Sequence, residues 1–316
     1  MATRSSSLRV VFWGTPEFAT APLRALLGEG FDVVGVVTQP DRPVGRSRST
    51  LVPSPVKEIA LAEGIPVLQP EKPRGEEFVA QLRALEPDVS VVVAYGHIIP
   101  KAVLDLPPSG SFNVHASLLP KLRGAAPIQA AILEGLPETG VTIMRMVPAL
   151  DAGPMLLQVS TPIAEDETYG ELALRLSELG ALALIEAMTL VAVGRAREEA
   201  QDDARATYAG KIDRESARID WTRPTLDVCR RIRAYDPKPG AFTEHRGAAL
   251  KLFGARRLPH VDRPPGEVVE ISGEGMVVAC GEGAVRVLQA QPAGKTRMAP
   301  EQLARGRGIA VGELLG

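Results

Sequence analysis

The chain has 316 residues, of which 45% are hydrophobic and 23% charged, and its 36 basic and 38 acidic residues nearly cancel. This composition excludes a disordered chain, and the length exceeds that of one small domain, so two domains are expected. No apolar run approaches the ~20 residues of a membrane-spanning helix, and the amino-terminal segment lacks the apolar core of a signal peptide. Cys229 and Cys280 are the only cysteines, too few for a disulfide framework or a structural zinc site. We therefore predict a cytoplasmic protein without membrane contact.

Charge is divided unevenly along the chain. Residues 209–316 carry 18 Lys and Arg against 13 Asp and Glu, which leaves 18 against 25 for residues 1–208. A basic part attached to an acidic part indicates a polyanionic partner for the basic part. Ordinary variation of surface charge explains the difference equally well, so the split is suggestive only.

Strand-like and helix-like segments alternate in the first half of the chain. Its Val-rich runs are too continuous for strands with one exposed face, which is typical of parallel strands covered on both sides. This alternation predicts an α/β fold, with a Rossmann-like, doubly wound, mostly parallel sheet and helices on both faces. We expect strands at 8–14, 31–39, 65–70 and 88–96 and helices at 56–63, 76–87 and 171–193.

The pattern changes after residue 193. Residues 194–208 are charged, rich in alanine and poor in large apolar side chains, as in a connection between domains. Beyond them, short strands at close spacing with Gly and Pro between them favour a small β-barrel or sandwich. The predicted domains are residues 1–193 and 209–316, with 194–208 as the linker.

The turn at residues 14–19, GTPEFA, follows the first predicted strand. Such a turn directs free backbone N–H groups outward and can hold an anion. The dinucleotide fingerprint G-x-G-x-x-G and the phosphate-binding loop are both missing, however. An ordinary tight turn is the better interpretation, and a nicotinamide-dependent oxidoreductase loses its main support.

Asn113 and His115 form the most informative pair in the chain. They lie two residues apart, so on a strand both side chains project from the same face. An amide donor then stands beside a titratable imidazole, and both can address one carbonyl group. Asp151 lies in a Gly- and Pro-flanked loop from which a carboxylate can reach an imidazole. Taken singly, a structural histidine and a turn aspartate are commoner, but the three together are a candidate acid–base set.

The segment NVHASLLPKLRGAAPIQ, with LDAGPML further along, closely resembles the signature of formyltransferases that use 10-formyltetrahydrofolate. Further segments resemble, in their usual order, those of the members that formylate methionyl-tRNA. These segments lie at 10–19, 38–46, 51–57, 207–221 and 232–242. The active-site motif is specific to the whole family, and the other segments narrow the resemblance to the branch that acts on tRNA.

Two segments depart from the pattern of that branch. MVPAL at 146–150 is more apolar than the acidic version usual before the aspartate, and RSRS at 46–49 replaces the more common lysines. Neither departure touches the Asn-His-Asp set. The second leaves the strength of the tRNA contacts open.

The resemblance implies transfer of the formyl group of 10-formyltetrahydrofolate to the α-amino group of methionyl initiator tRNA, giving N-formylmethionyl-tRNA for translation initiation. Asn113 is expected to donate a hydrogen bond to the developing oxyanion, and His115 to move a proton between the attacking and leaving nitrogens. Asp151 is expected to orient the imidazole and favour its charged form, or to take the amine's proton through a water. The division of roles between His115 and Asp151 stays open. We expect no metal, no covalent enzyme intermediate, and a monomer.

The same resemblance implies where both substrates bind. We expect the folate to contact residues of two segments, Ser117, Leu118, Leu119 and Pro120 together with Tyr95, Ile98 and Ile99. For the two isoleucines, core packing is a nearly equal interpretation.

The loop at 40–55 is implied to order on the acceptor arm of the tRNA. Arg42 is its best-matched residue, and Arg46 and Arg48 are weaker candidates. Phosphate contacts of this kind give affinity with little reading of base sequence. Residues 1–193 are then the formyltransferase catalytic domain. Residues 209–316 are expected to be an OB-like barrel that adds a tRNA-binding surface.

Two alternatives belong to different classes of function. A formyltransferase acting on a small amine, such as a glycinamide nucleotide or an amino sugar, would keep Asn113, His115 and Asp151 but would not need the arginine loop. A nucleic-acid-binding module on a degenerate Rossmann-like scaffold would bind RNA without using His115 or Asp151 and would not bind folate. The tRNA interpretation accounts for more of the chain than either.

Overall fold

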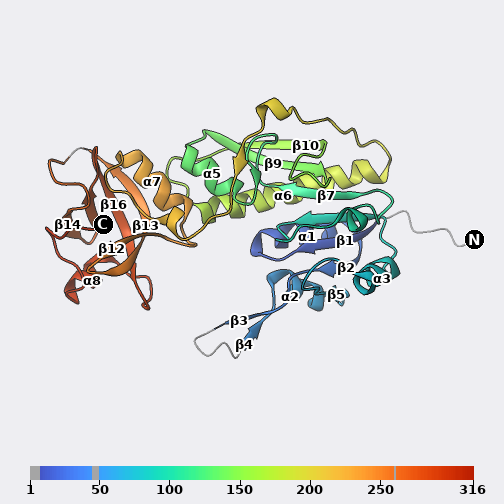
Figure 1. The fold of residues 1–316 in the computed structure, drawn as a ribbon, viewed down its shortest axis with the longest axis horizontal. Coiled ribbons are helices and arrows are strands. Elements are labelled where there is room, and N and C mark those ends of the chain that lie inside the picture. The colour runs from blue at the N-terminus through green and yellow to red at the C-terminus, as the bar shows by residue number, and fades with distance from the viewer. Residues whose placement is uncertain (1–7, 45–49, 260) are drawn as a thin grey trace, which may run out of the picture. The chain divides into compact units, whose positions relative to one another are not determined.

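The computed structural model describes residues 8–44, 50–259 and 261–316 (Figure 1). The chain divides into two compact units. The first comprises Met1–Gly124, Gly140–Thr161 and Leu174–Tyr208, and the second comprises Ala125–Thr139, Pro162–Ala173 and Ala209–Gly316.

A seven-stranded sheet forms the centre of the first unit. Its strands are, in spatial order, β10 (Met155–Pro162), β9 (Glu138–Arg145), β7 (Ser111–His115), β6 (Val89–Val93), β1 (Arg9–Gly14), β2 (Asp32–Val37) and β5 (Val67–Leu68). From β7 to β5 every neighbouring pair is parallel, and β9 runs antiparallel to β7. The sheet is therefore mostly parallel, as the continuous Val-rich runs predict.

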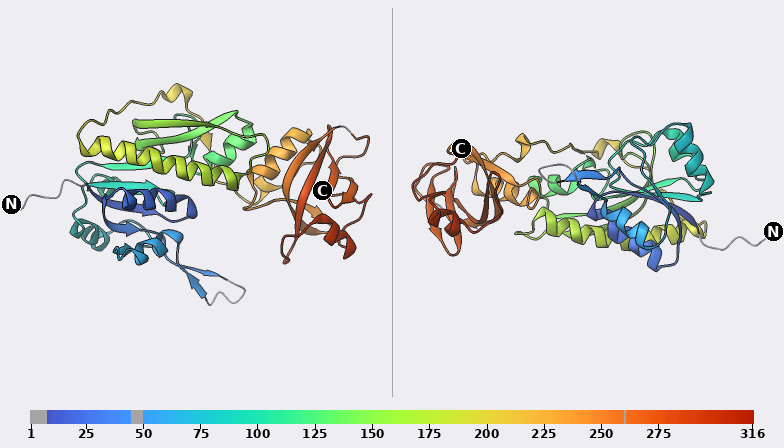
Figure 2. Two further views of the ribbon diagram at one scale, coloured as in Figure 1. Left: turned by 180° about the vertical axis from the view of Figure 1, so that it is seen from behind. Right: turned by 90° about the horizontal axis from the view of Figure 1, so that it is seen from below.

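Helices cover both faces of this sheet (Figure 2). They are η1 (Glu17–Ala19), α1 (Thr20–Gly28), α2 (Pro55–Ala62), α3 (Glu76–Ala84), α4 (Lys101–Leu104) and α6 (Tyr169–Ala192). On one face, Val11 and Trp13 of β1 pack with Phe78 and Leu82 of α3 in a buried apolar cluster. Burial on both faces explains why β1, β2 and β6 are almost continuously apolar.

The helix α6 packs closely on β7 because it carries a glycine at the contact. A Cβ atom at Gly180 would lie 2.9 Å from Cγ1 of Val114, which is tighter than side-chain contacts normally permit. A hydrogen bond from Ser177 to the carbonyl of Phe18, 2.7 Å, fixes the same helix further along. The strand that carries Asn113 and His115 is thus held rigidly from one face.

The strand order reverses beside β1. The chain passes from β1 outward to β2 and β5, and then returns to place β6 on the other side of β1. In open α/β sheets, ligands bind at the carboxyl ends of the strands near such a reversal. Tyr95, which follows β6, and His115, which ends β7, both lie at these strand ends.

Residues 40–55, expected as a loop, contain two short strands. β3 (Arg42–Val44) pairs antiparallel with β4 (Thr50–Val52). This hairpin pairs through backbone groups, and its sequence lacks the alternation of apolar and polar residues that identifies a strand. The sequence therefore did not reveal the two strands. At the base of the hairpin, the Asp41 carboxylate accepts hydrogen bonds from Nζ of Lys57 at 2.7 Å and from Nε2 of Gln69 at 2.8 Å.

The second unit is built around five antiparallel strands. In spatial order they are β12 (Ala241–His245), β13 (Ala248–Leu258), β16 (Ala284–Pro292), β15 (Gly275–Ala279) and β14 (Val268–Ser272). The described residues of this unit also form the helices α5 (Pro127–Glu134), η3 (Glu215–Ala217), α7 (Thr225–Ala234) and α8 (Pro300–Arg305). Trp221, Tyr235, Phe242 and Val287 lie in its buried core.

The predicted fold class is confirmed: a Rossmann-like, mostly parallel sheet with helices, followed by an all-β C-terminal part. None of the helices in the described chain combines the length and the hydropathy needed to span a membrane.

Candidate active site

Asn113 and His115 project from the same face of β7 near its carboxyl end. The strand has the burial pattern of a central strand, with Asn113 half-buried and His115 only 5% exposed. Among the residues that the structure describes, no group is hydrogen-bonded to the side-chain amide of Asn113. This amide is therefore free to donate to a carbonyl oxygen placed above the strand end.

The ring of His115 is oriented by a backbone carbonyl. Its Nε2 lies 3.0 Å from the carbonyl oxygen of Leu122. Because a carbonyl only accepts, Nε2 must carry the hydrogen. In the neutral ring, the lone pair is then on Nδ1. Nδ1 is the nitrogen that can take up and release a proton.

Nδ1 of His115 faces Asp151. Oδ2 of Asp151 lies 3.8 Å from Nδ1 and accepts a hydrogen bond of 2.8 Å from the backbone N–H of Gly124. The separation is too long for a direct hydrogen bond but short enough for electrostatic stabilisation of a protonated ring. The structure thus brings together the three residues that the sequence predicts as an acid–base set.

Asp151 adopts an uncommon backbone conformation. Its φ is +47°, in the left-handed region that aspartate tolerates better than most residues. Such a conformation persists when the surrounding structure holds it. The loop that carries Asp151 is therefore defined by its neighbours.

The segment expected to contact folate is fixed by residues from β9 and β10. Oγ1 of Thr142 donates to the carbonyl of Ser117 at 2.7 Å and accepts from the N–H of Leu119 at 3.2 Å. Nε2 of Gln158 donates to the carbonyl of Leu119 at 2.7 Å and to Oγ1 of Thr142 at 3.0 Å. Ser117, Leu119 and Pro120 are buried, and Leu118 is half-buried.

The other segment expected to contact folate is divided between core and surface. Tyr95 and Ile99 belong to a buried apolar cluster, whereas Ile98 is 89% exposed. Burial raises the pKa of Tyr95 to about 12, and its hydroxyl has no hydrogen-bond partner in the described chain. The structure therefore does not bring these three side chains together on one surface.

Arg42 begins the hairpin and is exposed. Its guanidinium donates a hydrogen bond to Oε1 of Gln39, and Nε2 of Gln39 donates to the carbonyl of Tyr95 at 2.9 Å. The base of the hairpin is thereby tied to the strand ends where His115 lies. Arg46 and Arg48 lie outside the described residues.

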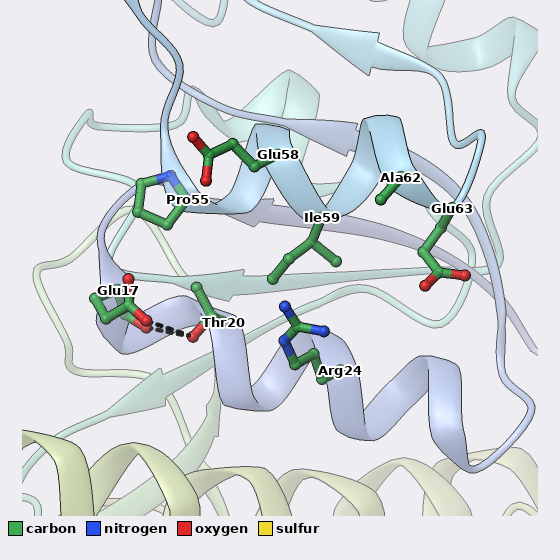
Figure 3. Close-up of a pocket in the computed structure, with 8 residues that line it drawn as sticks. All are labelled: Glu17, Thr20, Arg24, Pro55, Glu58, Ile59, Ala62 and Glu63. Atoms are coloured by element: carbon green, nitrogen blue, oxygen red, sulfur yellow. Dashed lines mark hydrogen bonds between the residues drawn. The ribbon is translucent and has the colours of Figure 1, made fainter.

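A hollow of about 220 Å³ lies elsewhere in the first unit, between α1 and α2 (Figure 3). It shares no residue with the Asn113, His115 and Asp151 set, and three glutamates, Glu17, Glu58 and Glu63, line it beside Arg24. Within the described ranges, no three His, Cys, Asp or Glu side chains converge as a group that could hold a metal ion.

Sequence reasoning missed the polar residues that support the site. Thr142, Gln158, Gln201 and Thr207 contact it through side chains that hydrogen-bond to backbone groups far away in sequence. A polar residue within an apolar run was the one available signal, and it exists for Thr142 in β9 and for Gln158 in β10.

Comparison with known proteins identifies the family. Residues 8–188 match the Formyl transferase family, and residues 211–308 match the Formyl transferase C-terminal domain. A methionyl-tRNA formyltransferase from Pseudomonas paraeruginosa is 49% identical over 98% of this chain and 100% of its own length. One from Bacillus licheniformis is 48% identical over 98% of each chain.

Solved structures share the fold at low sequence identity. HypX from Aquifex aeolicus in complex with tetrahydrofolic acid has a TM-score of 0.67 at 18% identity, covering 94% of this chain and 46% of HypX. This chain thus spans about half the length of HypX. The sugar 3N-formyl transferase WlaRD has a TM-score of 0.64 at 18% identity, covering 92% of this chain and 99% of its own. With both domains matched and relatives near 50% identity along almost the whole length, the chain belongs to the formyl transferase family, in the branch of the methionyl-tRNA formyltransferases.

Proposed function

We propose that this chain transfers the formyl group of 10-formyltetrahydrofolate to the α-amino group of methionyl initiator tRNA, giving N-formylmethionyl-tRNA. The observation that carries the proposal is the pairing of the Asn113 amide, which has no hydrogen-bond partner among the described residues, with a His115 ring whose Nδ1 faces Asp151. Nearly full-length similarity to methionyl-tRNA formyltransferases supports the choice of substrates. Because its proposed substrate is a charged initiator tRNA, we assign the reaction to the cytoplasm, and we propose that the chain acts as a monomer.

The residues present fit a formyl donor. The folate supplies a formyl group on N10, whose oxygen needs a hydrogen-bond donor when negative charge develops on it. The side-chain N–H groups of Asn113 are not bonded to any of the described residues, so they are available as donors. The amide carries no charge at any pH. A half-buried position limits competition from bulk water, which strengthens the bond.

His115 is assigned the proton transfers. As the α-amino group of the methionyl ester attacks the formyl carbon, it loses a proton, and Nδ1 of His115 can accept one because Nε2 is committed to Leu122. The same Nδ1–H can then protonate the departing nitrogen. Asp151 stabilises the ring while it is charged.

Binding of the two substrates is assigned to separate segments. Ser117, Leu118, Leu119 and Pro120 are proposed to contact the folate together with the exposed Ile98 of the neighbouring loop. The buried Tyr95 and Ile99 are proposed to support the pocket from the apolar cluster. Arg42 is proposed to contact tRNA phosphates, and residues 209–316 to add a second tRNA-binding surface. The exposure of Arg42 supports the first tRNA contact, and the excess of basic residues supports the second.

The test is formyl transfer to methionyl initiator tRNA by the wild-type chain and by His115→Ala. We expect the variant to lose a factor of about 10² to 10⁴ in kcat, the usual contribution of a positioned acid–base group. As a control, Asp105→Asn alters an exposed carboxylate that is paired with Lys101 and should retain full activity.

An active His115→Ala variant would contradict the assigned role. If the wild-type chain binds folate but does not formylate the tRNA, the substrate is a small amine. If it does not bind folate at all, the formyl transfer proposal falls.

A further inference from the structure

Residues 198–207, here called the strap, lie between the two ranges that match the family, 8–188 and 211–308. Composition alone marks them as a connection. In the structure the strap is instead bonded along its length to the first unit. Glu198 forms an ion pair with Arg145 at 2.6 Å, and Glu199 exchanges two backbone hydrogen bonds of 2.8 Å with Met155.

Gln201 of the strap holds the loop that carries Asp151. Its Nε2 donates to the carbonyl of Asp151 at 2.8 Å and to the carbonyl of Gly153 at 2.7 Å. An amide nitrogen has two hydrogens, and here each has a carbonyl within reach. One of these carbonyls belongs to Asp151 itself, whose φ of +47° persists only where surrounding groups hold it, and the other lies two residues further along the loop.

The orientation of Gln201 is itself fixed. Its Oε1 accepts from Nε and Nη2 of Arg123 at 3.1 and 2.8 Å, and the Arg123 side chain is buried. Arg123 also forms an ion pair of 2.7 Å with Asp203 further along the strap. With a guanidinium on its oxygen, the Gln201 amide can present only its nitrogen to the Asp151 loop.

Thr207 supports the other half of the acid–base pair. Its Oγ1 accepts a hydrogen bond of 2.9 Å from the N–H of Leu122. Leu122 also has a positive φ, +57°, and its carbonyl is the acceptor that orients His115. The strap thus supports both partners through backbone groups: Gln201 binds the carbonyl of Asp151, and Thr207 binds the N–H of Leu122, whose carbonyl orients His115.

We propose that Gln201 and Thr207 are positioning residues for formyl transfer: Gln201 sets the place of the Asp151 carboxylate, and Thr207 sets the Leu122 carbonyl that orients His115. The inference rests on the proposed function of His115 and Asp151. Neither residue is assigned contact with a substrate.

The first test compares Gln201→Glu with the wild-type chain. The substituted carboxylate still accepts from Arg123 but cannot donate to the carbonyls of Asp151 and Gly153. We expect kcat to fall about 10- to 100-fold, as misplacement of a catalytic group by about 1 Å does. The KM values for 10-formyltetrahydrofolate and methionyl initiator tRNA should stay within about twofold, because substrate contacts are untouched.

Three further variants make the test specific. Gln201→Met, which has neither donor nor acceptor, should lose at least as much kcat. Thr207→Val should lower kcat with unchanged KM values, and Thr207→Ser, which restores the hydroxyl, should recover most of it. Asp202→Asn is the matched control: this exposed neighbour caps the N–H of Ala204, and asparagine can do the same, so kcat should not change.

A double-mutant cycle distinguishes positioning from general destabilisation. If Gln201 acts through Asp151, then Gln201→Glu should change kcat less than about twofold when Asp151→Asn is already present. Equal fold losses in both backgrounds would overturn the inference, as would wild-type kcat in Gln201→Glu. Failure of the wild-type chain to formylate methionyl-tRNA would instead overturn the proposed function, so the two failures are distinct.

Discussion

The imidazole of His115 lies between two oxygen atoms of different kinds. The Leu122 carbonyl can only accept from Nε2, whereas the Asp151 carboxylate lies 3.8 Å from Nδ1 without a direct bond. A ring held in this way cannot turn over without losing its bond to Leu122. The proton transfer proposed for His115 is therefore confined to one side of the ring, the side that faces the Asp151 carboxylate.

Gly153 permits the Asp151 loop to return close to β9. A Cβ at this position would lie 1.8 Å from the carbonyl oxygen of Arg145, a backbone atom that cannot move aside cheaply. We expect Gly153→Ala to displace the loop, lowering kcat about 10- to 100-fold and the free energy of unfolding by about 1–3 kcal/mol. Kinetics together with urea titration measure both quantities.

The matched control for this substitution is Gly28→Ala. A Cβ at Gly28 meets nothing within 4 Å, so neither kcat nor stability should fall. Normal kcat in Gly153→Ala would show that the loop tolerates displacement, contrary to the assigned role of Asp151.

At the scale of single residues, sequence predicts what depends on local geometry. Asn113 and His115 share a face because strand side chains alternate with a period of two. The sequence identifies Asp151 only as a candidate, because its distance from His115 depends on how the loop folds. Gln201 and Thr207 gave no signal at all, because their partners lie 48 to 85 residues away in the chain.

Among the elements, α6 shows how a helix start depends on a reciprocal pair. Thr168 donates from its backbone N–H and hydroxyl to Oε2 of Glu171 at 2.9 and 2.7 Å, and Glu171 N–H donates back to Oγ1 of Thr168 at 3.3 Å. This is a capping box. The hydrogen bonds from the Thr168 backbone and side chain hold the pKa of Glu171 below its ordinary value.

The lowered pKa of Glu171 gives the box a definite dependence on pH. A carboxyl whose pKa is lowered by folding stabilises the folded state above its ordinary pKa, and that stabilisation is lost as the pH falls through the lowered value. We expect Glu171→Ala to reduce the free energy of unfolding by about 1 kcal/mol at pH 7. The difference from the wild-type chain should shrink below about pH 4 as the carboxyl protonates, which urea titrations at several pH values measure.

Glu178→Ala is the control for the capping box, because Glu178 is an exposed glutamate inside the same helix. Its effect on stability should be small and nearly independent of pH. A pH-independent loss in Glu171→Ala would show that the helix start does not depend on the ionised carboxylate.

Elements were predicted best where burial imposes a pattern. The helices α2, α3 and α6 and the strands β1, β2 and β6 lie where the apolar spacing places them. The hairpin β3–β4 was expected as a loop, because its pairing uses backbone groups and its sequence contains Pro43 in place of an apolar alternation. Sequence pattern detects burial, and the described side chains of this hairpin, Arg42, Pro43, Leu51 and Val52, are exposed.

At the scale of the whole molecule, charge bears on the proposed tRNA partner. Each phosphate contact releases counterions, so binding weakens with salt in proportion to the number of contacts. We expect Arg42→Ala to weaken tRNA binding and to reduce the slope of log K against log salt by about 1. The difference from the wild-type chain should therefore narrow as salt rises, and filter binding at several salt concentrations measures it.

Arg74→Ala removes an exposed arginine outside the hairpin and serves as the control. It should leave the slope unchanged. An unchanged slope in Arg42→Ala as well would remove Arg42 from the proposed tRNA contacts while leaving the chemistry of His115 intact.

The strap affects the order in which the candidate active site forms while the chain is synthesised. Asn113, His115 and Asp151 are all synthesised before Gln201 and Thr207. Until then, the loop of Asp151 and the backbone of Leu122 lack the groups that hold them in their left-handed conformations. A nascent chain that has reached residue 193 thus carries every reactive group but not their final arrangement. On the proposed roles of Gln201 and Thr207, the candidate active site is completed only when the chain that follows the first family domain folds back onto it.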